Sequence, residues 1–292
     1  MAATVATIVP RPLRNFAATV LLGAVAGAAG LYVGVPALER GMTFFPAKYQ
    51  PSRPWQLPAG AADVWFPTAD DGVRLHGWFL TATGRRTGIT VLMLHGNAGT
   101  LVDLAEDAVI FQNKGFDVLL MDYRGYGQSD GRTLDEATLN LDGRAALRYL
   151  TADRGLDPAT IALFGYSLGT AVATDLAVSS PCRAVALVAP VASARRQALL
   201  RYPAMPALVL DRLRNSFDTV GRIGKANCPV LVVHGTADEV IPIAEGRAVY
   251  EAAQQPKRMI TLTGGKHWLA NSVGPGYLDE VAGFFVAPSR DP

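Results

Sequence analysis

The chain has 292 residues, of which 50% are hydrophobic and 18% are charged. This composition excludes a disordered or fibrous protein and allows one large buried core. The formal net charge of +2 is too small to indicate a nucleic-acid partner, and no basic run is interleaved with aromatic residues. We therefore expect one main globular domain that does not bind nucleic acid.

Residues 16–38 contain no charged side chain and follow Arg11 and Arg14. A helix of about 20 apolar residues spans a bilayer, so this stretch is long enough for a single-pass transmembrane anchor. A cleaved signal peptide, with small residues at 26–28 as the cleavage site, is the alternative. We favour the retained anchor because the apolar character continues past that site. The charges before it predict a cytoplasmic tail over residues 1–15, with the main domain facing the periplasm or the outside.

Residues 39–60 are predicted to be a linker. Four prolines lie between positions 41 and 60, and they prevent a long helix there. Aromatic residues in the same stretch suit either the membrane interface or a flap laid on the domain.

The domain over residues 61–292 begins with a predicted antiparallel hairpin around the turn Asp70-Asp71-Gly72. Strands and helices then alternate, and the later strands are almost continuously apolar, which indicates a parallel sheet covered on both faces. The sequence therefore predicts an α/β fold with a mostly parallel eight-stranded sheet and helices on both faces. The predicted strands are 63–66, 73–80, 89–94, 116–122, 160–166, 184–189, 229–233 and 259–262. The helices expected between them include 100–113 and 134–152.

Residues 190–225 interrupt this alternation with seven basic and two acidic side chains around an apolar run at 202–210. An insertion at the carboxyl end of a sheet strand is where a cap over an active site would lie. A solvated helical excursion is the other interpretation of the same residues.

The sequence Gly165-Tyr166-Ser167-Leu168-Gly169 joins a predicted strand to a helix of small residues. This arrangement predicts a tight turn that exposes the Ser167 hydroxyl as a nucleophile, with glycines where neighbouring backbone must pass close by. Because the chain has 29 glycines, the pentapeptide alone is a weak signal, and the remaining partners must support it.

A serine nucleophile needs a histidine base and a carboxylate that orients this base. Among four histidines, only His267 lies in the loop after the last predicted strand, and Asp238 follows the strand before it. The order Ser167, Asp238, His267 is that of α/β-hydrolases. His95 ends a strand, and we expect it to be structural.

The oxyanion of a tetrahedral intermediate needs backbone donors. We assign the N–H of Leu168, directly after the nucleophile, and the N–H of Asn97 in the loop His95-Gly96-Asn97-Ala98-Gly99. Polar residues in the next loop, Asp122, Arg124 and Asp130, are expected to hold loops in place.

These motifs, taken in order from His-Gly-Asn-Ala-Gly through Gly-Tyr-Ser-Leu-Gly to Gly-Lys-His, resemble the membrane-anchored α/β-hydrolase-domain serine hydrolases over residues 41–286. The resemblance implies an N-terminal anchor before a domain of α/β-hydrolase fold. It maps nucleophile, acid and base onto Ser167, Asp238 and His267. Members act on carboxylic esters or thioesters, often of lipids or acylated proteins. No metal or organic cofactor is implied, because the expected mechanism needs only protein groups and water.

We therefore expect a membrane-bound serine hydrolase that forms an acyl-enzyme on Ser167 with a small-molecule acyl ester or thioester. A serine peptidase or amidase of the same fold is one alternative, although the insertion has no acidic cluster to hold a peptide amine. A non-catalytic membrane-tethered binding module is another, although no member of the catalytic set is missing. Cys182 and Cys228 are either small buried side chains or, in an oxidising compartment, a disulfide. The number of subunits is left open.

Overall fold

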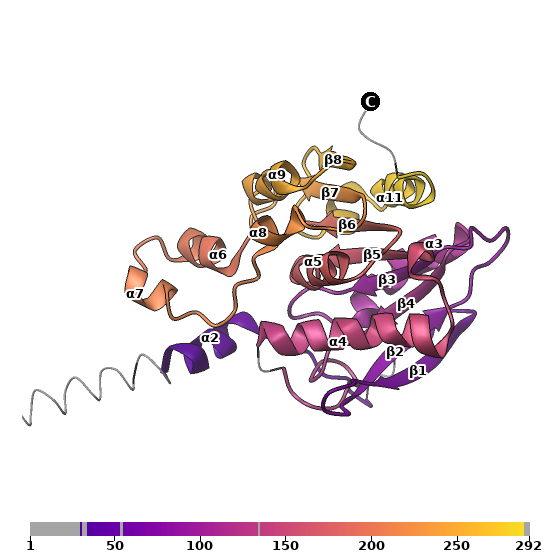
Figure 1. The fold of residues 1–292 in the computed structure, drawn as a ribbon, viewed down its shortest axis with the longest axis horizontal. Coiled ribbons are helices and arrows are strands. Elements are labelled where there is room, and N and C mark those ends of the chain that lie inside the picture. The colour runs from indigo at the N-terminus through magenta and orange to yellow at the C-terminus, as the bar shows by residue number, and fades with distance from the viewer. Residues whose placement is uncertain (1–29, 31–33, 53–54, 134, 289–292) are drawn as a thin grey trace, which may run out of the picture.

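The computed structural model describes residue 30 and residues 34–52, 55–133 and 135–288. Its centre is an eight-stranded sheet in the order β1-β2-β4-β3-β5-β6-β7-β8 (Figure 1). The strands are β1 (Ala61–Pro67), β2 (Arg74–Leu80), β3 (Thr90–Leu94), β4 (Asp117–Met121), β5 (Ile161–Tyr166), β6 (Ala184–Val188), β7 (Val230–Gly235) and β8 (Lys257–Leu262). The predicted eight strands are confirmed, with ends that differ by at most two residues.

The sheet is antiparallel at one edge and parallel elsewhere. Strand β1 pairs antiparallel with β2, and β2 pairs antiparallel with β4. Every pairing from β4 to β8 is parallel. Because parallel strands end at the same edge, the loops after β3, β5, β7 and β8 meet there.

Helices cover both faces of the sheet, as predicted (Figure 1). Helices α4, α5, α8 and α9 share one buried apolar cluster, and α3, α10 and α11 share the other. The helices are α2 (Val35–Thr43), α3 (Ala105–Asn113), α4 (Glu136–Arg148), α5 (Gly169–Ser179), α6 (Ala194–Arg201), α7 (Ala207–Leu210), α8 (Thr219–Ile223), α9 (Ile243–Ala252), α10 (Leu269–Val273) and α11 (Tyr277–Val286).

Two predicted helices are divided in the structure. The stretch 100–113 begins as a 3₁₀ turn over Leu101–Leu104, because the Asp103 carboxylate binds the Thr100 N–H and starts a tight turn there. The stretch after residue 134 is α4 followed by a wider π turn over Tyr149–Asp153. Helix α10 was not predicted, because five residues carry too little periodicity to reveal it.

The predicted insertion at 190–225 also divides into two parts. Helices α6 and α7 project at one end of the molecule beside α2 (Figure 1), and we call residues 190–217 the cap. Helix α8 instead packs against α5 and α9 on the face of the sheet.

The predicted membrane span at 16–38 lies mostly outside the described residues, which include only 30 and 34–38 of it. Its last residues enter α2, which continues to Thr43. None of the helices in the described ranges has the length and apolar character needed to cross a bilayer.

The segment after α2 is held to the domain by several contacts. Phe44 is buried and packs edge-on against Phe217 of the cap, with ring centroids 6.1 Å apart. Lys48 forms an isolated parallel bridge with Gly127. The beginning of the predicted linker therefore lies against both the cap and the sheet domain.

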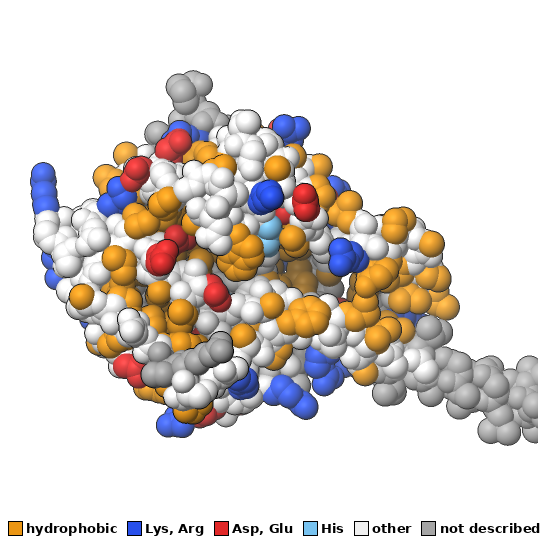
Figure 2. All heavy atoms as spheres, turned by 180° about the vertical axis from the view of Figure 1, so that it is seen from behind, with side chains coloured by type: hydrophobic (Ala, Val, Ile, Leu, Met, Phe, Trp, Pro, Cys, Tyr) orange, Lys and Arg blue, Asp and Glu red, His pale blue; other side chains and the backbone are white. Residues whose placement is uncertain are grey.

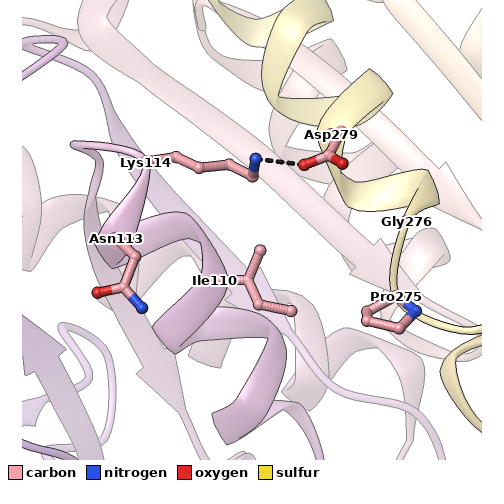
Figure 3. Close-up of a pocket in the computed structure, with 6 residues that line it drawn as sticks. All are labelled: Ile110, Asn113, Lys114, Pro275, Gly276 and Asp279. Atoms are coloured by element: carbon pink, nitrogen blue, oxygen red, sulfur yellow. Dashed lines mark ion pairs between the residues drawn. The ribbon is translucent and has the colours of Figure 1, made fainter.

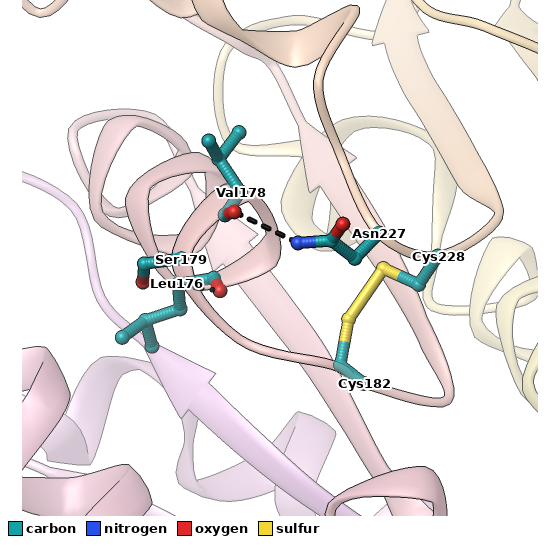
Figure 4. Close-up of a disulfide and its surroundings, with 6 residues drawn as sticks. All are labelled: Leu176, Val178, Ser179, Cys182, Asn227 and Cys228. Carbon is teal, nitrogen blue, oxygen red and sulfur yellow. Dashed lines mark hydrogen bonds between the residues drawn. A yellow bond between two sulfur atoms is a disulfide. The ribbon is translucent and has the colours of Figure 1, made fainter.

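Cys182 and Cys228 form a disulfide (Figure 4), with Cα atoms 5.7 Å apart. They precede the neighbouring strands β6 and β7, and beside them the Asn227 side chain donates a hydrogen bond of 2.8 Å to the Val178 carbonyl. The disulfide therefore joins two loops at the amino edge of the parallel sheet, away from the loops that follow the strands.

Replacing both cysteines by serine is expected to lower the free energy of unfolding by roughly 2–4 kcal/mol, because the cross-link restricts the unfolded chain. Guanidinium denaturation with and without a phosphine reductant measures the difference. The reductant should destabilise the wild type and leave the double-serine variant unchanged. Two free thiols in the unfolded, unreduced wild type would contradict the assignment.

Candidate active site

Ser167 lies on a strained turn between β5 and α5. Its φ is +51°, a left-handed backbone conformation that is uncommon for residues other than glycine. The Ser167 N–H donates to the Val188 carbonyl at 2.9 Å, which ties the turn to β6. A Cβ on Gly165 would lie 2.6 Å from the Gly169 carbonyl oxygen, and one on Gly169 would lie 2.2 Å from that of Leu94. Both glycines are therefore required by close backbone contacts around the turn.

The structure brings Ser167, His267 and Asp238 into one hydrogen-bonded chain. His267 Nε2 lies 3.2 Å from Ser167 Oγ, and His267 Nδ1 lies 2.9 Å from Asp238 Oδ2. The three residues follow β5, β8 and β7 and are separated by up to 100 positions in the sequence. Their geometry is that required for a serine, its base and the carboxylate that orients the base.

Asp238 is buried, and burial opposes its ionisation. The nearby rings of His234 and His267 and the Ile241 N–H outweigh this effect and hold the pKa of Asp238 well below its usual range. His234 Nε2 lies 2.8 Å from the Ile241 carbonyl and 3.5 Å from the carboxylate, so we assign its hydrogen bond to the carbonyl. The N–H groups of Val240 and Ile241 donate to Asp238 Oδ1 at 2.9 and 2.8 Å.

The ionised Asp238 determines the tautomer of His267. A carboxylate only accepts hydrogen bonds, so Nδ1 carries the proton that is donated to it. The lone pair on Nε2 then faces the Ser167 hydroxyl, which donates to it. This hydrogen-bonded arrangement allows a proton to pass from Ser167 Oγ to His267 Nε2.

Tyr166 supports the histidine loop, a role that sequence reasoning missed. Its hydroxyl donates to the His267 carbonyl and accepts the Leu269 N–H at 3.1 Å. Its ring stacks on Trp268, with centroids 5.4 Å apart. The residue stands inside the nucleophile motif, but nothing in a pentapeptide reveals a partner 101 positions away.

Of the predicted oxyanion donors, Leu168 follows Ser167 directly, and Asn97 follows Gly96, which packs against Ser167. A Cβ on Gly96 would be 3.2 Å from Ser167 Cβ, so the peptide before Asn97 passes directly beside the serine. Leu168 immediately precedes α5, at the positive end of the helix dipole. Within the described residues, no protein acceptor takes either backbone N–H.

Polar residues behind the site hold its loops, as expected. The buried His95 lies with Nδ1 2.7 Å from the Gly96 carbonyl, and burial lowers its pKa, so the ring is neutral and donates from this nitrogen. Asp122 accepts the Leu101 N–H at 2.8 Å. Arg124 binds Asp142 through both its backbone N–H and its Nε at 2.8 Å, and Asp130 accepts from Arg74 Nε at the surface at 2.8 Å.

Two surface hollows lie away from this constellation. The larger, of about 400 Å³, lies between α3 and the start of α11 and is spanned by the ion pair of Lys114 and Asp279 (Figure 3). The second, of about 320 Å³, lies beside Cys228 and Pro256. Neither is lined by Ser167, Asp238 or His267, and among the residues described no cluster of potential ligands has the composition of a metal site.

The fold and this site indicate a protein of the α/β-hydrolase class, and comparisons with known proteins agree with this. A family model described as serine aminopeptidase, S33, matches residues 86–221. Rv2307c of Mycobacterium tuberculosis is 39% identical over 243 residues, covering 82% of this chain and 84% of the relative. YfhR of Escherichia coli is 32% identical over 79% of this chain and 82% of its own length. The chain belongs to the α/β-hydrolase family.

Further similarities extend to an animal protein and to solved structures. The mouse α/β-hydrolase domain-containing protein 17C is 32% identical over 73% of this chain and 64% of its own length. An esterase of Pyrococcus furiosus matches 85% of this chain and 99% of its own chain, with a TM-score of 0.67 and 19% identity. At that identity the structural match establishes the shared fold, and the family assignment supports a hydrolase in the broad sense.

Tyr166→Phe is expected to lower the free energy of unfolding by about 1–3 kcal/mol, because the His267 carbonyl and the Leu269 N–H lose a buried partner. Urea denaturation measures the change. Tyr149→Phe is the matched control: its hydroxyl accepts only a surface hydrogen bond of 3.4 Å from Arg154, and a surface change of this kind stays within about 0.5 kcal/mol. Equal stabilities of the two variants would contradict a supporting role for Tyr166.

Proposed function

We propose that the protein is a serine hydrolase that cleaves carboxylic esters or thioesters through an acyl-enzyme on Ser167. The observation that supports this most directly is the hydrogen-bonded set Ser167–His267–Asp238, with distances of 3.2 and 2.9 Å. Beside it are two backbone N–H groups that find no acceptor among the residues the structure describes. This combination supplies a nucleophile, a base and donors for a developing oxyanion.

In the proposed reaction, Ser167 Oγ bonds to the acyl carbon while its proton passes to His267 Nε2. The electron pair of the carbonyl bond moves to oxygen, which accepts hydrogen bonds from the N–H groups of Leu168 and Asn97. When the carbonyl re-forms, the alcohol or thiol leaves with the proton from His267. Water then attacks the acyl-enzyme with His267 as base, which releases the acid and restores Ser167.

The surface beside the site supports lipid-like acyl substrates. Exposed hydrophobic side chains gather on α2 and the cap (Figure 2). Exposed arginines that form no ion pair within the described part of the chain lie among them, which suits anionic headgroups. The hydrophobic residues are Leu38, Met42, Leu199, Leu200, Tyr202 and Leu208, and the arginines are Arg201, Arg212 and Arg214.

We further propose that residues 16–38 anchor the protein in a membrane, with 1–15 in the cytoplasm and the hydrolase domain in the periplasm or outside. The apolar sequence of 16–38 supports the anchor. The Cys182–Cys228 disulfide supports an oxidising compartment for the domain, because thiols are kept reduced in the cytosol.

A peptidase of the same fold is the second candidate, since the matched family model is described as a serine aminopeptidase. Recognition of a free peptide amine requires an available carboxylate. Both acidic residues of the predicted insertion are already engaged: Asp211 accepts from Arg195 at 2.7 Å, and Asp218 accepts the Gly221 N–H at 2.9 Å. We therefore place ester hydrolysis first.

Ser167→Ala is expected to abolish hydrolysis of p-nitrophenyl butyrate, and Asp238→Asn to lower kcat by about 10⁴-fold, because the asparagine stabilises the wrong histidine tautomer. Glu239→Gln, at the exposed neighbour of Asp238, is the control and should retain wild-type kcat. Labelling by a fluorophosphonate probe checks the nucleophile independently. Full activity of Ser167→Ala would refute the assignment, and faster turnover of aminoacyl-amides than of esters would favour the peptidase.

The double variant Leu200→Ser/Leu208→Ser tests whether the cap presents lipid substrates. The ratio of the rate on a long-chain ester in anionic vesicles to the rate on soluble butyrate ester is expected to fall about tenfold, because less apolar area is buried in the lipid. The two substrates are compared in the same full-length protein. Val286→Ser, at an exposed position at the end of α11, is the matched control. An unchanged ratio between the two substrates would remove the argument for lipid presentation through the cap.

A further inference from the structure

The side chain of Asn97 makes four hydrogen bonds. Its Oδ1 accepts from the Phe45 N–H at 3.1 Å, the Ala98 N–H at 3.0 Å and the Tyr126 hydroxyl at 3.1 Å. Its Nδ2 donates to the Thr43 carbonyl at 2.5 Å. The orientation of the amide is therefore determined by a donor and an acceptor from the same short stretch of chain.

That stretch belongs to residues 39–49, which we call the brace segment. At its far end, Gly127 donates to the Ala47 carbonyl at 2.8 Å and accepts the Tyr49 N–H at 3.1 Å. In its middle, the buried Phe44 packs on Phe217. The brace segment is thus fixed to the loop after β4 and to the cap independently of Asn97.

Its first residue is fixed to the cap as well. The Glu39 carboxylate is buried and accepts the N–H groups of Arg214 and Asn215 at 2.8 and 2.9 Å, and Asn215 Nδ2 at 2.8 Å. Asn215 Oδ1 in turn accepts the Glu136 N–H at the start of α4. The brace segment therefore has supports that do not move with the loop 95–99.

The peptide between Gly96 and Asn97 is also held from its other side. His95 binds the Gly96 carbonyl at 2.7 Å. A trans peptide is planar, so its N–H points away from its C=O, and the Asn97 N–H is directed away from the His95 ring. Ala98 follows with a φ of +59°, so this loop keeps a conformation that the backbone alone does not favour.

We propose that Asn97 is a positioning residue: its side chain, clamped by Thr43 and Phe45 of the brace segment, holds the Asn97 N–H in place as an oxyanion donor. The inference rests on the proposed function and adds to it a second role for Asn97 and a catalytic contribution from residues before the first strand. In this proposal the brace segment supports the oxyanion site although it contains no reacting group.

The first test is Asn97→Ala in the full-length protein. This variant keeps the backbone N–H but loses the clamp, so kcat for p-nitrophenyl butyrate should fall about 10- to 100-fold while KM changes less than about threefold. Affinity for a trifluoromethyl ketone, which mimics the tetrahedral intermediate, should fall by the same factor as kcat/KM. Asn227→Ala is the matched control, because Asn227 also binds a backbone carbonyl, that of Val178, but at the opposite edge of the sheet.

The second test compares two changes at one position. Phe45→Pro removes the N–H that Asn97 accepts, whereas Phe45→Ala removes only the exposed ring. We expect kcat of Phe45→Pro to lie about tenfold below that of Phe45→Ala. End-point labelling with a fluorophosphonate gives the active fraction, so kcat is expressed per labelled site and partial unfolding does not imitate the effect.

A kcat per labelled site within twofold of wild type for Asn97→Ala would overturn the proposal, as would equal values for the two Phe45 variants. A rise in KM with unchanged kcat would also overturn it, because that pattern indicates a substrate contact. If the wild-type protein neither hydrolyses esters nor reacts with the probe, the proposed function fails instead, and the two failures are therefore distinguishable.

Discussion

The sharp turn at Ser167 is the constraint on which the rest of the site depends. A serine backbone at φ +51° is stable only where the surrounding structure enforces it. Here the backbone of Leu94, the carbonyl of Val188 and the first turn of α5 do so. Close packing of β3, β5 and α5 leaves no space for a Cβ at Gly165 or Gly169. The same packing brings Gly96 against Ser167, so the loop 95–99, which carries the predicted oxyanion donor, lies beside the turn.

Electrostatics then decides the protonation of the constellation. A buried carboxylate is costly unless donors compensate for the lost water, and Asp238 has donors from its own loop and from His267. Because these groups hold the charge in place, His267 keeps one tautomer and directs its free lone pair at Ser167. Tyr166 links the end of β5 to the loop that carries His267 through two hydrogen bonds.

The site is also supported from outside the sheet. Residues 39–49 join the cap, through Glu39, to the oxyanion loop, through Asn97. In the proposed arrangement this segment follows a membrane anchor directly, so the attachment of the chain to the bilayer and the geometry of the oxyanion loop share one short stretch.

The sequence by itself determined the α/β class, the eight strands, the hairpin edge and the candidates Ser167, Asp238, His267, Asn97 and Leu168, because these depend on local patterns: apolar runs, glycine at a tight turn, and polar residues after strands. The tertiary structure alone decided how these candidates meet, since parallel strands bring loops far apart in sequence to one edge. It also decided the roles of Tyr166 and residues 43–45, the division of the insertion and the pairing of the cysteines. Such contacts depend on which segments pack together, and no local pattern of residues encodes a partner 50 or 100 positions away.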